Sequence, residues 1–245
     1  MTTADKLITI AENEQKVYNN GYSQSESDFW DKVQNNGSRN NYEYGFYRWN
    51  CKELKPKYKV RPNSSSRTIY MFSTNDGLEE IKKEYFDLSR ITPDTSANSA
   101  SSHYYTFYYC RNLKVIEDIG LQGGGYQQTF GACLELHTIE KFRCVAGGSY
   151  SNPFSQCVKL KNITIDGEIG KSFPIPNSPL STASIVSIIE HLSQDVTGQT
   201  LTLNKTAVNN MTFPYTSPYS QATYTSWDDV INNPVVKNWT ISLSS

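Results

Sequence analysis

The stretch 130-FGACLELHTI-139 decides the predicted fold, because its four spaced residues recur along the chain. Phenylalanine, cysteine, leucine and isoleucine stand in it at successive steps of three. The same order returns as 107-FYYCRNLKVI-116 and as 154-FSQCVKLKNI-163, and an earlier copy, 72-FSTNDGLEEI-81, has Asn75 in place of cysteine. Self-similarity of this kind is typical of an array of stacked units.

The copies follow one another at short intervals. Cys110, Cys133 and Cys157 are separated by 23 and 24 residues, whereas Asn75 precedes Cys110 by 35. The longer interval contains the Ser/Asn/Thr-rich insert 92-TPDTSANSAS-101. The sequence therefore predicts an α/β repeat fold, a short solenoid in which each coil adds one strand to a parallel β-sheet.

Stacked coils place each position of the motif in a column. The Leu and Ile columns are expected to point inward from the strands, and the Phe column to fill the opposite side. Asn75, Cys110, Cys133 and Cys157 are expected to form a buried structural ladder, in which each side chain satisfies the backbone of its own coil. An asparagine in a column of cysteines is not expected of a disulfide framework or of a metal site.

Different patterns precede the repeats, which are predicted over residues 71–177. Apolar and aromatic residues recur at helical spacing between residues 3 and 35, so an N-terminal helix is predicted within residues 1–37. This stripe either packs on the same chain or forms a coiled coil between copies, as an oligomerisation segment. Residues 38–70 are predicted to cap the first coil.

The C-terminal part, residues 178–245, is predicted to cap the last coil with helix and strand. A helix is expected to begin near Pro179, where apolar residues take up helical spacing, and a strand is expected at 200–203. A loop, a helix and a strand are expected in turn at 213–224, 226–233 and 238–243. Such elements cover the core and the sheet edge that an open coil would expose.

With these motifs the chain resembles the BspA-like leucine-rich repeats, and in its layout the leucine-rich-repeat proteins of phages and prophages of gut Firmicutes. The resemblance covers nearly the whole chain, including 46-FYRWNCKELKPKY-58, 160-LKNITIDGEIGKSF-173, 179-PLSTASIVSIIEHL-192 and 200-TLTLNKTAVNN-210. It implies a right-handed leucine-rich-repeat solenoid and a role in virion structure or host interaction. The insert at 92–101 and Asn75 depart from the pattern, which leaves the register of the coils open there.

Charge and hydropathy exclude two classes of partner. The chain has 23 basic and 24 acidic residues, so neither nucleic acid nor an anionic membrane surface is an expected partner. No apolar stretch approaches the length that would span a bilayer. Asp5, Glu12 and Glu14 stand where a secretory signal would be free of charge. The expected location is therefore the virion, or the bacterial cytoplasm before assembly.

The sequence contains few residues or motifs of the kinds that support catalysis. None of His103, His137 and His191 lies in a metal-binding motif. Cys144 lies outside the ladder and is expected to be a buried or idle thiol, because a nucleophilic cysteine needs a histidine partner. The glycines at 123–125 are followed by no Gly-Lys-Ser/Thr and are expected to form a connector. The sequence predicts a non-enzymatic protein that needs neither cofactor nor metal.

Tyrosines surround the start of the copy of the motif at 107–116. Tyr104, Tyr105, Tyr108 and Tyr109 form a candidate contact surface, because tyrosine-rich faces bind proteins and glycans well. The alternative interpretation divides these side chains between the core and ordinary surface.

The predicted function is that of a phage or prophage structural or receptor-binding accessory protein. Its expected partners are other virion proteins or a host surface receptor, contacted through protein or glycan, and further copies of the chain through residues 3–35. The alternative is a bacterial surface module for adhesion to host proteins, which requires export.

Overall fold

The computed structural model describes residues 46–48, 52, 54, 60, 68–89, 91, 103–122 and 124–245. The predicted N-terminal helix, with its oligomerisation segment, lies outside the described residues. Most of the predicted cap at 38–70 and the insert at 92–101 lie outside them as well.

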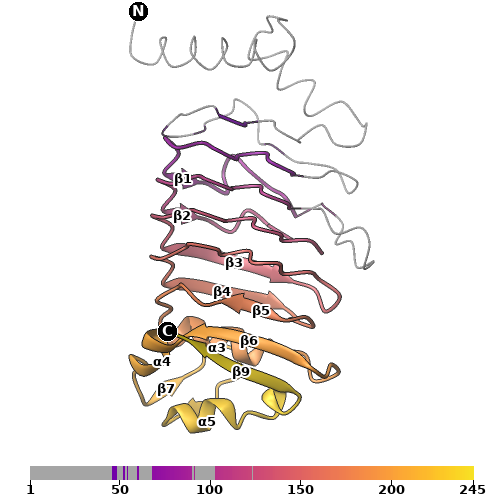
Figure 1. Cartoon of the computed structure of the whole chain (residues 1–245), viewed down its shortest axis with the longest axis vertical. Helices are drawn as coiled ribbons and strands as arrows, with labels where there is room; N and C mark the ends of the chain where they lie inside the picture. Colours follow the sequence, from indigo (N-terminus) through magenta and orange to yellow (C-terminus); the bar gives the residue numbers. More distant parts are fainter. Residues whose placement is uncertain are drawn as a thin grey trace, which may run out of the picture.

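Four parallel strands form the first sheet, in the order in which they occur along the chain. They are β1 (Glu80–Ile81), β2 (Val115–Ile116), β3 (Thr138–Cys144) and β4 (Asn162–Gly167). Their register pairs the four isoleucines of the motif in one buried row, Ile81, Ile116, Ile139 and Ile163. The prediction of a parallel sheet within an α/β fold is confirmed, and Figure 1 shows the strands one above another.

A column of phenylalanine rings runs behind this sheet. Successive ring centroids lie 5.2, 4.9, 5.4 and 5.4 Å apart, with the ring planes within 5° of parallel, for Phe46, Phe72, Phe107, Phe130 and Phe154. Offset stacked aromatic pairs contribute about 0.5–1.5 kcal/mol beyond the area that they bury. We call each turn of chain that supplies one of these rings a layer and name it after its phenylalanine. The column includes Phe46, which lies in the range predicted as a cap.

The backbone around each phenylalanine has a conformation that the sequence did not predict. The residues two before and two after it have positive φ in four layers, namely Tyr70 and Thr74, Tyr105 and Tyr109, Gln128 and Ala132, and Asn152 and Gln156. None of these is glycine, although this conformation costs about 1 kcal/mol for a residue with a β-carbon. Hydrogen bonds between layers offset the cost, as where Phe107 N donates to Thr129 O at 2.8 Å and Phe130 N to Pro153 O at 2.9 Å.

The C-terminal part forms a second parallel sheet of order β5-β6-β9, made of β5 (Phe173–Ile175), β6 (Gln199–Asn204) and β9 (Trp239–Ser244). Between β5 and β6 lies helix α3 (Thr182–Glu190), whose N-cap Ser181 accepts a hydrogen bond from Ser184 N. The remaining elements are helices α4 (Lys205–Asn209) and α5 (Trp227–Ile231), a 3-10 helix η1 (Pro234–Val236), and a hairpin of β7 (Tyr215–Thr216) and β8 (Thr223–Tyr224).

The structure refines the predicted elements of residues 178–245. The first helix begins three residues after Pro179, and the strands at 199–204 and 239–244 lie within a residue of the predicted ones. The helix predicted at 226–233 is shorter, and the predicted loop at 213–224 contains the hairpin β7–β8. The short elements β5 and α4 were not predicted, because a few residues carry too little periodicity to be recognised.

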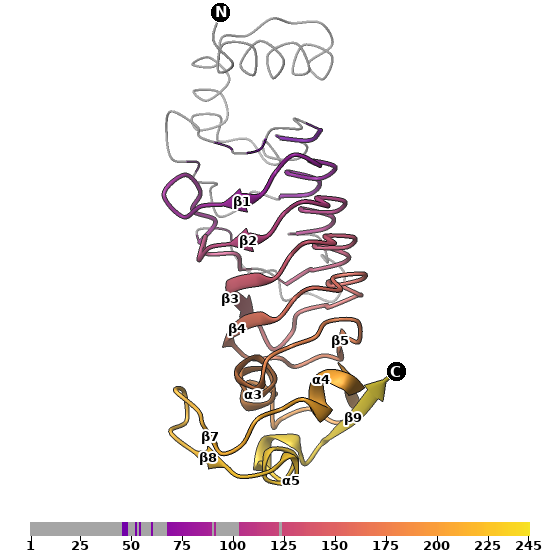
Figure 2. The same cartoon turned by 90° about the vertical axis from the view of Figure 1, so that its left-hand side faces the viewer.

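The described chain is an elongated stack with these C-terminal elements at one end (Figures 1 and 2). Phe173 of β5 packs against Phe154, with 5.8 Å between ring centroids, and so closes the aromatic column. None of the helices in the described residues has the length and hydropathy needed to cross a bilayer.

Candidate functional site

The ladder residues lie in one buried column and bond to backbone carbonyls. Asn75 donates to Phe46 O, Cys110 to Phe72 O, Cys133 to Phe107 O and Cys157 to Phe130 O, over 3.0, 2.9, 3.0 and 3.0 Å. The amide and the thiols thus make the same bond in four consecutive layers.

The acceptor corrects the expectation that each ladder residue satisfies its own coil. Every acceptor carbonyl belongs to the preceding layer. Within a layer the turn is closed by the backbone instead, as where Cys133 N donates to Phe130 O at 3.1 Å. The ladder side chain can therefore donate to a carbonyl of the preceding layer, and the ladder joins neighbouring layers.

The described cysteines are Cys110, Cys133, Cys144 and Cys157, and all are free and buried. Burial raises the pKa of the Cys133, Cys144 and Cys157 thiols. A protonated thiol is a poor nucleophile and a poor metal ligand. Burial and raised pKa values thus favour the protonated thiol in Cys133, Cys144 and Cys157.

The four tyrosines of the candidate contact surface lie together on the side that carries the phenylalanine turns. Tyr105 packs edge-on against Tyr104 and Tyr108, with ring centroids 6.4 and 5.0 Å away, and Tyr108 meets Tyr109 at 4.4 Å. All four are partly exposed. The four tyrosines are therefore neither core residues nor scattered surface residues, but one partly exposed cluster.

Two further tyrosines extend this surface toward the N-terminus. Tyr70 stacks on Tyr105 with 5.0 Å between centroids and 3° between planes, and Tyr47 packs edge-on against Tyr70 at 6.5 Å. We call the six side chains the tyrosine strip: Tyr47, Tyr70, Tyr104, Tyr105, Tyr108 and Tyr109. Sequence reasoning overlooked Tyr70, although Tyr70 and Tyr105 both stand two residues before the phenylalanine of their layer.

The strip ends at the Phe130 layer because no tyrosine stands at the corresponding positions there. Gly131 takes the position that Tyr108 has in the preceding layer, and the Tyr108 ring lies over it. A β-carbon on Gly131 would come within 2.8 Å of Tyr108 Cδ2. Gln128 and Ala132 stand where Tyr105 and Tyr109 stand one layer earlier.

The strip is uncharged except at two guanidinium groups. Burial raises the pKa of Tyr104 and Tyr108, and neighbouring tyrosines add to the effect, so both phenols stay protonated at neutral pH. Arg48 lies 5.0 Å above the Tyr47 ring and Arg111 5.1 Å above the Tyr109 ring. The strip thus offers ring edges, hydroxyl groups and two cations, a combination suited to holding protein or sugar.

The histidines differ in environment. His103 is fully buried and stacks on Tyr126, whereas His137 is exposed. His191 is buried at the end of α3, where Nδ1 lies 2.7 Å from Ser187 O. Within the described ranges no three His, Cys, Asp or Glu side chains gather as a metal ion would require.

His103 belongs to a buried column one turn away from the phenylalanines. Thr68, His103 and Tyr126 each stand four residues before the phenylalanine of their layer. Nε2 lies 2.7 Å from the Gln122 carbonyl, which can only accept, so Nε2 carries the hydrogen and Nδ1 accepts from Thr68 Oγ1 at 2.7 Å. Burial lowers the pKa of His103 to about 4, so the ring is neutral at pH 7.

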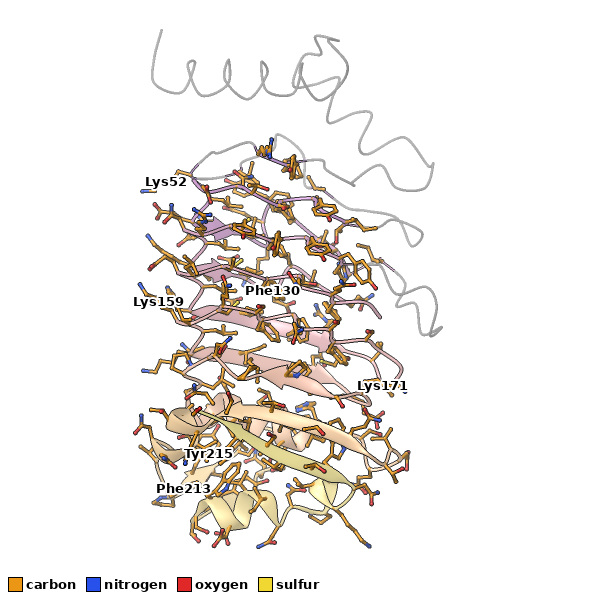
Figure 3. The ribbon with its side chains drawn as sticks, in the orientation of Figure 1. Lys52, Phe130, Lys159, Lys171, Phe213 and Tyr215 are labelled. Carbon is orange, nitrogen blue, oxygen red and sulfur yellow. The ribbon has the colours of Figure 1, made fainter. Side chains whose placement is uncertain are left out.

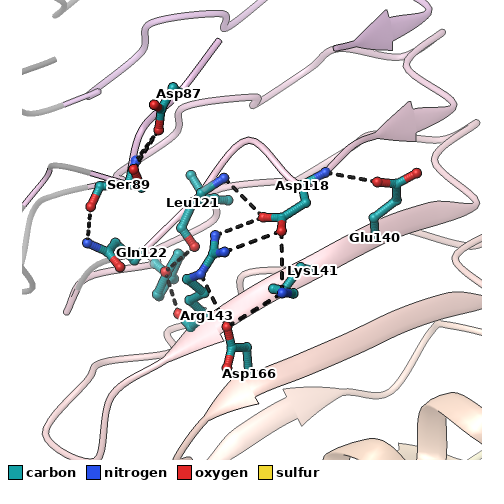
Figure 4. Close-up of polar contacts among 11 residues, drawn as sticks. Asp87, Ser89, Asp118, Leu121, Gln122, Glu140, Lys141, Arg143 and Asp166 are labelled. Atoms are coloured by element: carbon teal, nitrogen blue, oxygen red, sulfur yellow. Dashed lines mark hydrogen bonds and ion pairs between the residues drawn. The ribbon is translucent and has the colours of Figure 1, made fainter. Parts of the chain in front are cut away.

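A group of charged side chains lies at the end of the first sheet (Figure 4). Arg143 pairs with Asp118 at 2.8 Å and with Asp166 at 3.2 Å, and Lys141 lies 3.4 Å from Asp118. Burial acts to raise the pKa of Asp118, but the hydrogen bond and charge of Arg143 outweigh it and the pKa is lowered. These ion pairs join side chains from successive layers, so the group binds the layers together.

Glu190 is the other carboxylate with several partners. It accepts from Ser217 Oγ at 2.6 Å, from Tyr224 OH at 2.8 Å and from the Ser220 hydroxyl. These three hydroxyl donors hold the hairpin β7–β8 against α3. The sequence carried no signal for this contact, because the loop that supplies the hydroxyls has no period.

No protein-family model, no curated protein and no solved structure matches this chain. The candidate functional site therefore rests on geometry, and the tyrosine strip is the described surface with the largest concentration of aromatic contact groups.

Proposed function

We propose that the chain is a leucine-rich-repeat solenoid of the BspA-like kind, and that it acts without catalysis as a structural or receptor-binding accessory protein of a phage or prophage. The observation that carries this proposal is the tyrosine strip. Six tyrosines from three consecutive layers present ring edges and hydroxyls on one surface.

The solenoid part of the proposal is supported by the repeated geometry of the layers. The four layers from Phe72 to Phe154 each add one strand, one stacked phenylalanine and one ladder side chain in the same order. A solenoid of nearest-neighbour layers is the arrangement in which such columns form. The C-terminal elements then serve as the cap of its last coil.

The non-catalytic part is supported by the state of the reactive groups. In the described residues the cysteines are buried, His103 is neutral and Glu190 accepts hydrogen bonds from three hydroxyls. Partly exposed tyrosines, by contrast, are over-represented in surfaces that bind proteins. We place the contact with another virion protein, a host receptor or its glycan on the tyrosine strip, and self-association on residues 3–35.

Three fractions of a native culture test the proposal. After prophage induction, peptides of this chain are expected in particles purified by density gradient. Recovery only from the bacterial surface would favour the alternative, an adhesion module that binds host proteins. Recovery only from the soluble cytoplasm would contradict both.

Site-specific cross-linking tests the strip itself. A photo-reactive phenylalanine analogue in place of Tyr108 is expected to cross-link to a virion protein or receptor. The matched control places the same analogue at Ser155, which follows the phenylalanine of its layer as Tyr108 does and is also partly exposed. Equal cross-linking at both positions would remove the strip from the proposal.

A further inference from the structure

An open groove lies where the repeated layers meet the C-terminal elements. Its volume is about 670 Å³, and its walls come from the Phe154 layer, from the segment that leads into α3, and from α4. This size is within the range of about 300–1,000 Å³ that is usual for ligand pockets. None of the six tyrosines of the strip lines the groove, so it would be a second binding site.

The floor of the groove is apolar and partly uncovered. Val158 lines it with 52% of its surface exposed, beside Leu180 and Ala207. Leu134, which is 38% exposed, holds the position of Val158 in the preceding layer. In the two layers before that, charged residues hold this position. They are Arg111 and Asp76, and the distance from Arg111 Nε to Asp76 Oδ1 is 4.0 Å. Exposed aliphatic side chains thus appear at this position only in the layers next to the groove, as expected for a contact surface.

All ionisable side chains that line the groove are basic types. Lys159 is paired with Glu135 at 2.6 Å, on the rim. Lys161 has no ion-pair partner within the part of the chain that the structure describes, and His137 is exposed. The groove therefore combines an apolar floor with an uncompensated ammonium group, which complements a carboxylate next to an aliphatic side chain.

The polar wall fits a peptide backbone. The side-chain amide of Asn210 forms no hydrogen bond with any described residue, and it offers both a donor and an acceptor. An extended polymer of phosphates would need many more cations than the groove provides. A peptide needs fewer contacts, because a few residues usually carry most of the binding energy of a protein interface.

We propose that this groove binds an extended acidic peptide segment of a partner protein. An aliphatic side chain of the segment packs on Val158 and Leu180, a neighbouring carboxylate pairs with Lys161, and the Asn210 amide bonds the peptide backbone. The proposal needs neither the tyrosine strip nor the phage assignment to hold.

The test uses the full chain and an array of short synthetic peptides that combine Glu or Asp with Leu, Ile or Val. Binding of the best peptide is followed by fluorescence anisotropy at low and at physiological salt. Lys161→Glu and Val158→Ser are each expected to weaken binding about tenfold or more, because one removes the charge pair and the other the apolar contact. Both side chains are exposed, so neither substitution disturbs the core.

Lys171→Glu is the matched control. Lys171 is also exposed, and Figure 3 shows it at the opposite edge of the stack from Lys159. It changes the net charge equally and is expected to leave binding unchanged. The proposal is overturned if no acidic peptide binds better than its Lys-substituted version, or if Lys171→Glu and Lys161→Glu weaken binding alike. It is also overturned if Val158→Ser abolishes a concentration-dependent dimer in sedimentation, because a second copy then occupies the groove.

Discussion

The thiol of Cys133 donates a hydrogen bond of 3.0 Å to the carbonyl oxygen of Phe107, one layer earlier in the stack. The same carbonyl already accepts from Cys110 N at 3.1 Å, so both of its lone pairs are used. A buried side chain thereby joins two layers at a point where neither strand reaches. Because Asn75 makes the equivalent bond, the role depends on a donor of the right length and not on sulfur.

Substitutions at Asn75 separate the need for a hydrogen-bond donor from a need for sulfur. Asn75→Ala is expected to lower the free energy of unfolding by about 2 kcal/mol, because the Phe46 carbonyl loses a buried donor and a cavity remains. Asn75→Cys is expected to retain most of the stability, since cysteine fills this position in the following layers. Urea unfolding followed by circular dichroism measures both. Equal losses in the two variants would contradict the claim that a thiol can replace the amide in this ladder.

His103 makes the stability of the stack sensitive to acid. Its pKa lies at about 4 in the folded protein and near 6.5 in the unfolded chain, because burial disfavours the imidazolium. The unfolded state therefore takes up the proton first. The stability that the neutral ring provides is complete above pH 6.5 and declines as the pH falls to 4, by about 3 kcal/mol in total.

Urea titrations at several pH values test this dependence. His103→Gln is expected to be less stable at pH 7 but to have a flatter profile between pH 6.5 and 4. His137→Gln supplies the control, because it removes an exposed imidazole in place of a buried one. Parallel profiles for the wild type and His103→Gln would contradict the assignment.

The Tyr108 ring can be displaced through its glycine neighbour. Gly131→Ala places a β-carbon 2.8 Å from Tyr108 Cδ2, and the partly exposed ring is expected to move aside. The cost in stability is about 1 kcal/mol, while the tyrosine signal in near-ultraviolet circular dichroism changes, because Tyr108 contacts both Tyr105 and Tyr109.

Gly170→Ala is the contrasting substitution. Its β-carbon would lie 2.0 Å from the Ala146 carbonyl oxygen, and a backbone atom cannot move aside as a ring can. We expect the free energy of unfolding to fall by about 4 kcal/mol or more. The midpoint and slope of urea unfolding measure this loss. If Gly131→Ala were the more destabilising of the two, the placement of Tyr108 would be wrong.

The ion pair of Arg143 and Asp118 makes a smaller contribution to the free energy of unfolding. This contribution depends on pH and salt. The lowered pKa of Asp118 means that its contribution is present above pH 4 and is lost as the pH falls through the folded value. Both groups are partly exposed, so Asp118→Asn is expected to cost about 1 kcal/mol or less, and less still at high salt. Thermal unfolding at two salt concentrations measures the loss, and a larger effect at high salt would contradict an ionic origin.

The buried thiols should resist alkylation in the folded protein. Raised pKa values and burial predict that Cys133, Cys144 and Cys157 react with iodoacetamide only after urea unfolds the chain. Peptide mapping scores each cysteine by itself, so Cys51, which lies outside the described residues, does not obscure the result. Labelling of Cys133 in native buffer would show that the layers separate.

The sequence alone determined the features that repeat within one layer. Steps of three from Phe130 to Cys133, Leu136 and Ile139 recur with little change, and a periodic local pattern specifies which side chains face inward. The parallel sheet and the helix at Thr182–Glu190 follow from such patterns. The cluster of tyrosines at 104–109 was visible for the same reason.

Only the tertiary structure decided what depends on the offset between layers. It showed that the Cys133 thiol reaches the carbonyl of the previous layer, that Tyr70 stacks on Tyr105, and that His103 is enclosed between Thr68 and Gln122. These contacts join residues 19 to 35 positions apart in the chain. Their geometry depends on how the intervening turns position one layer on the next. The sequence of these turns has no periodic pattern, so it does not predict that position.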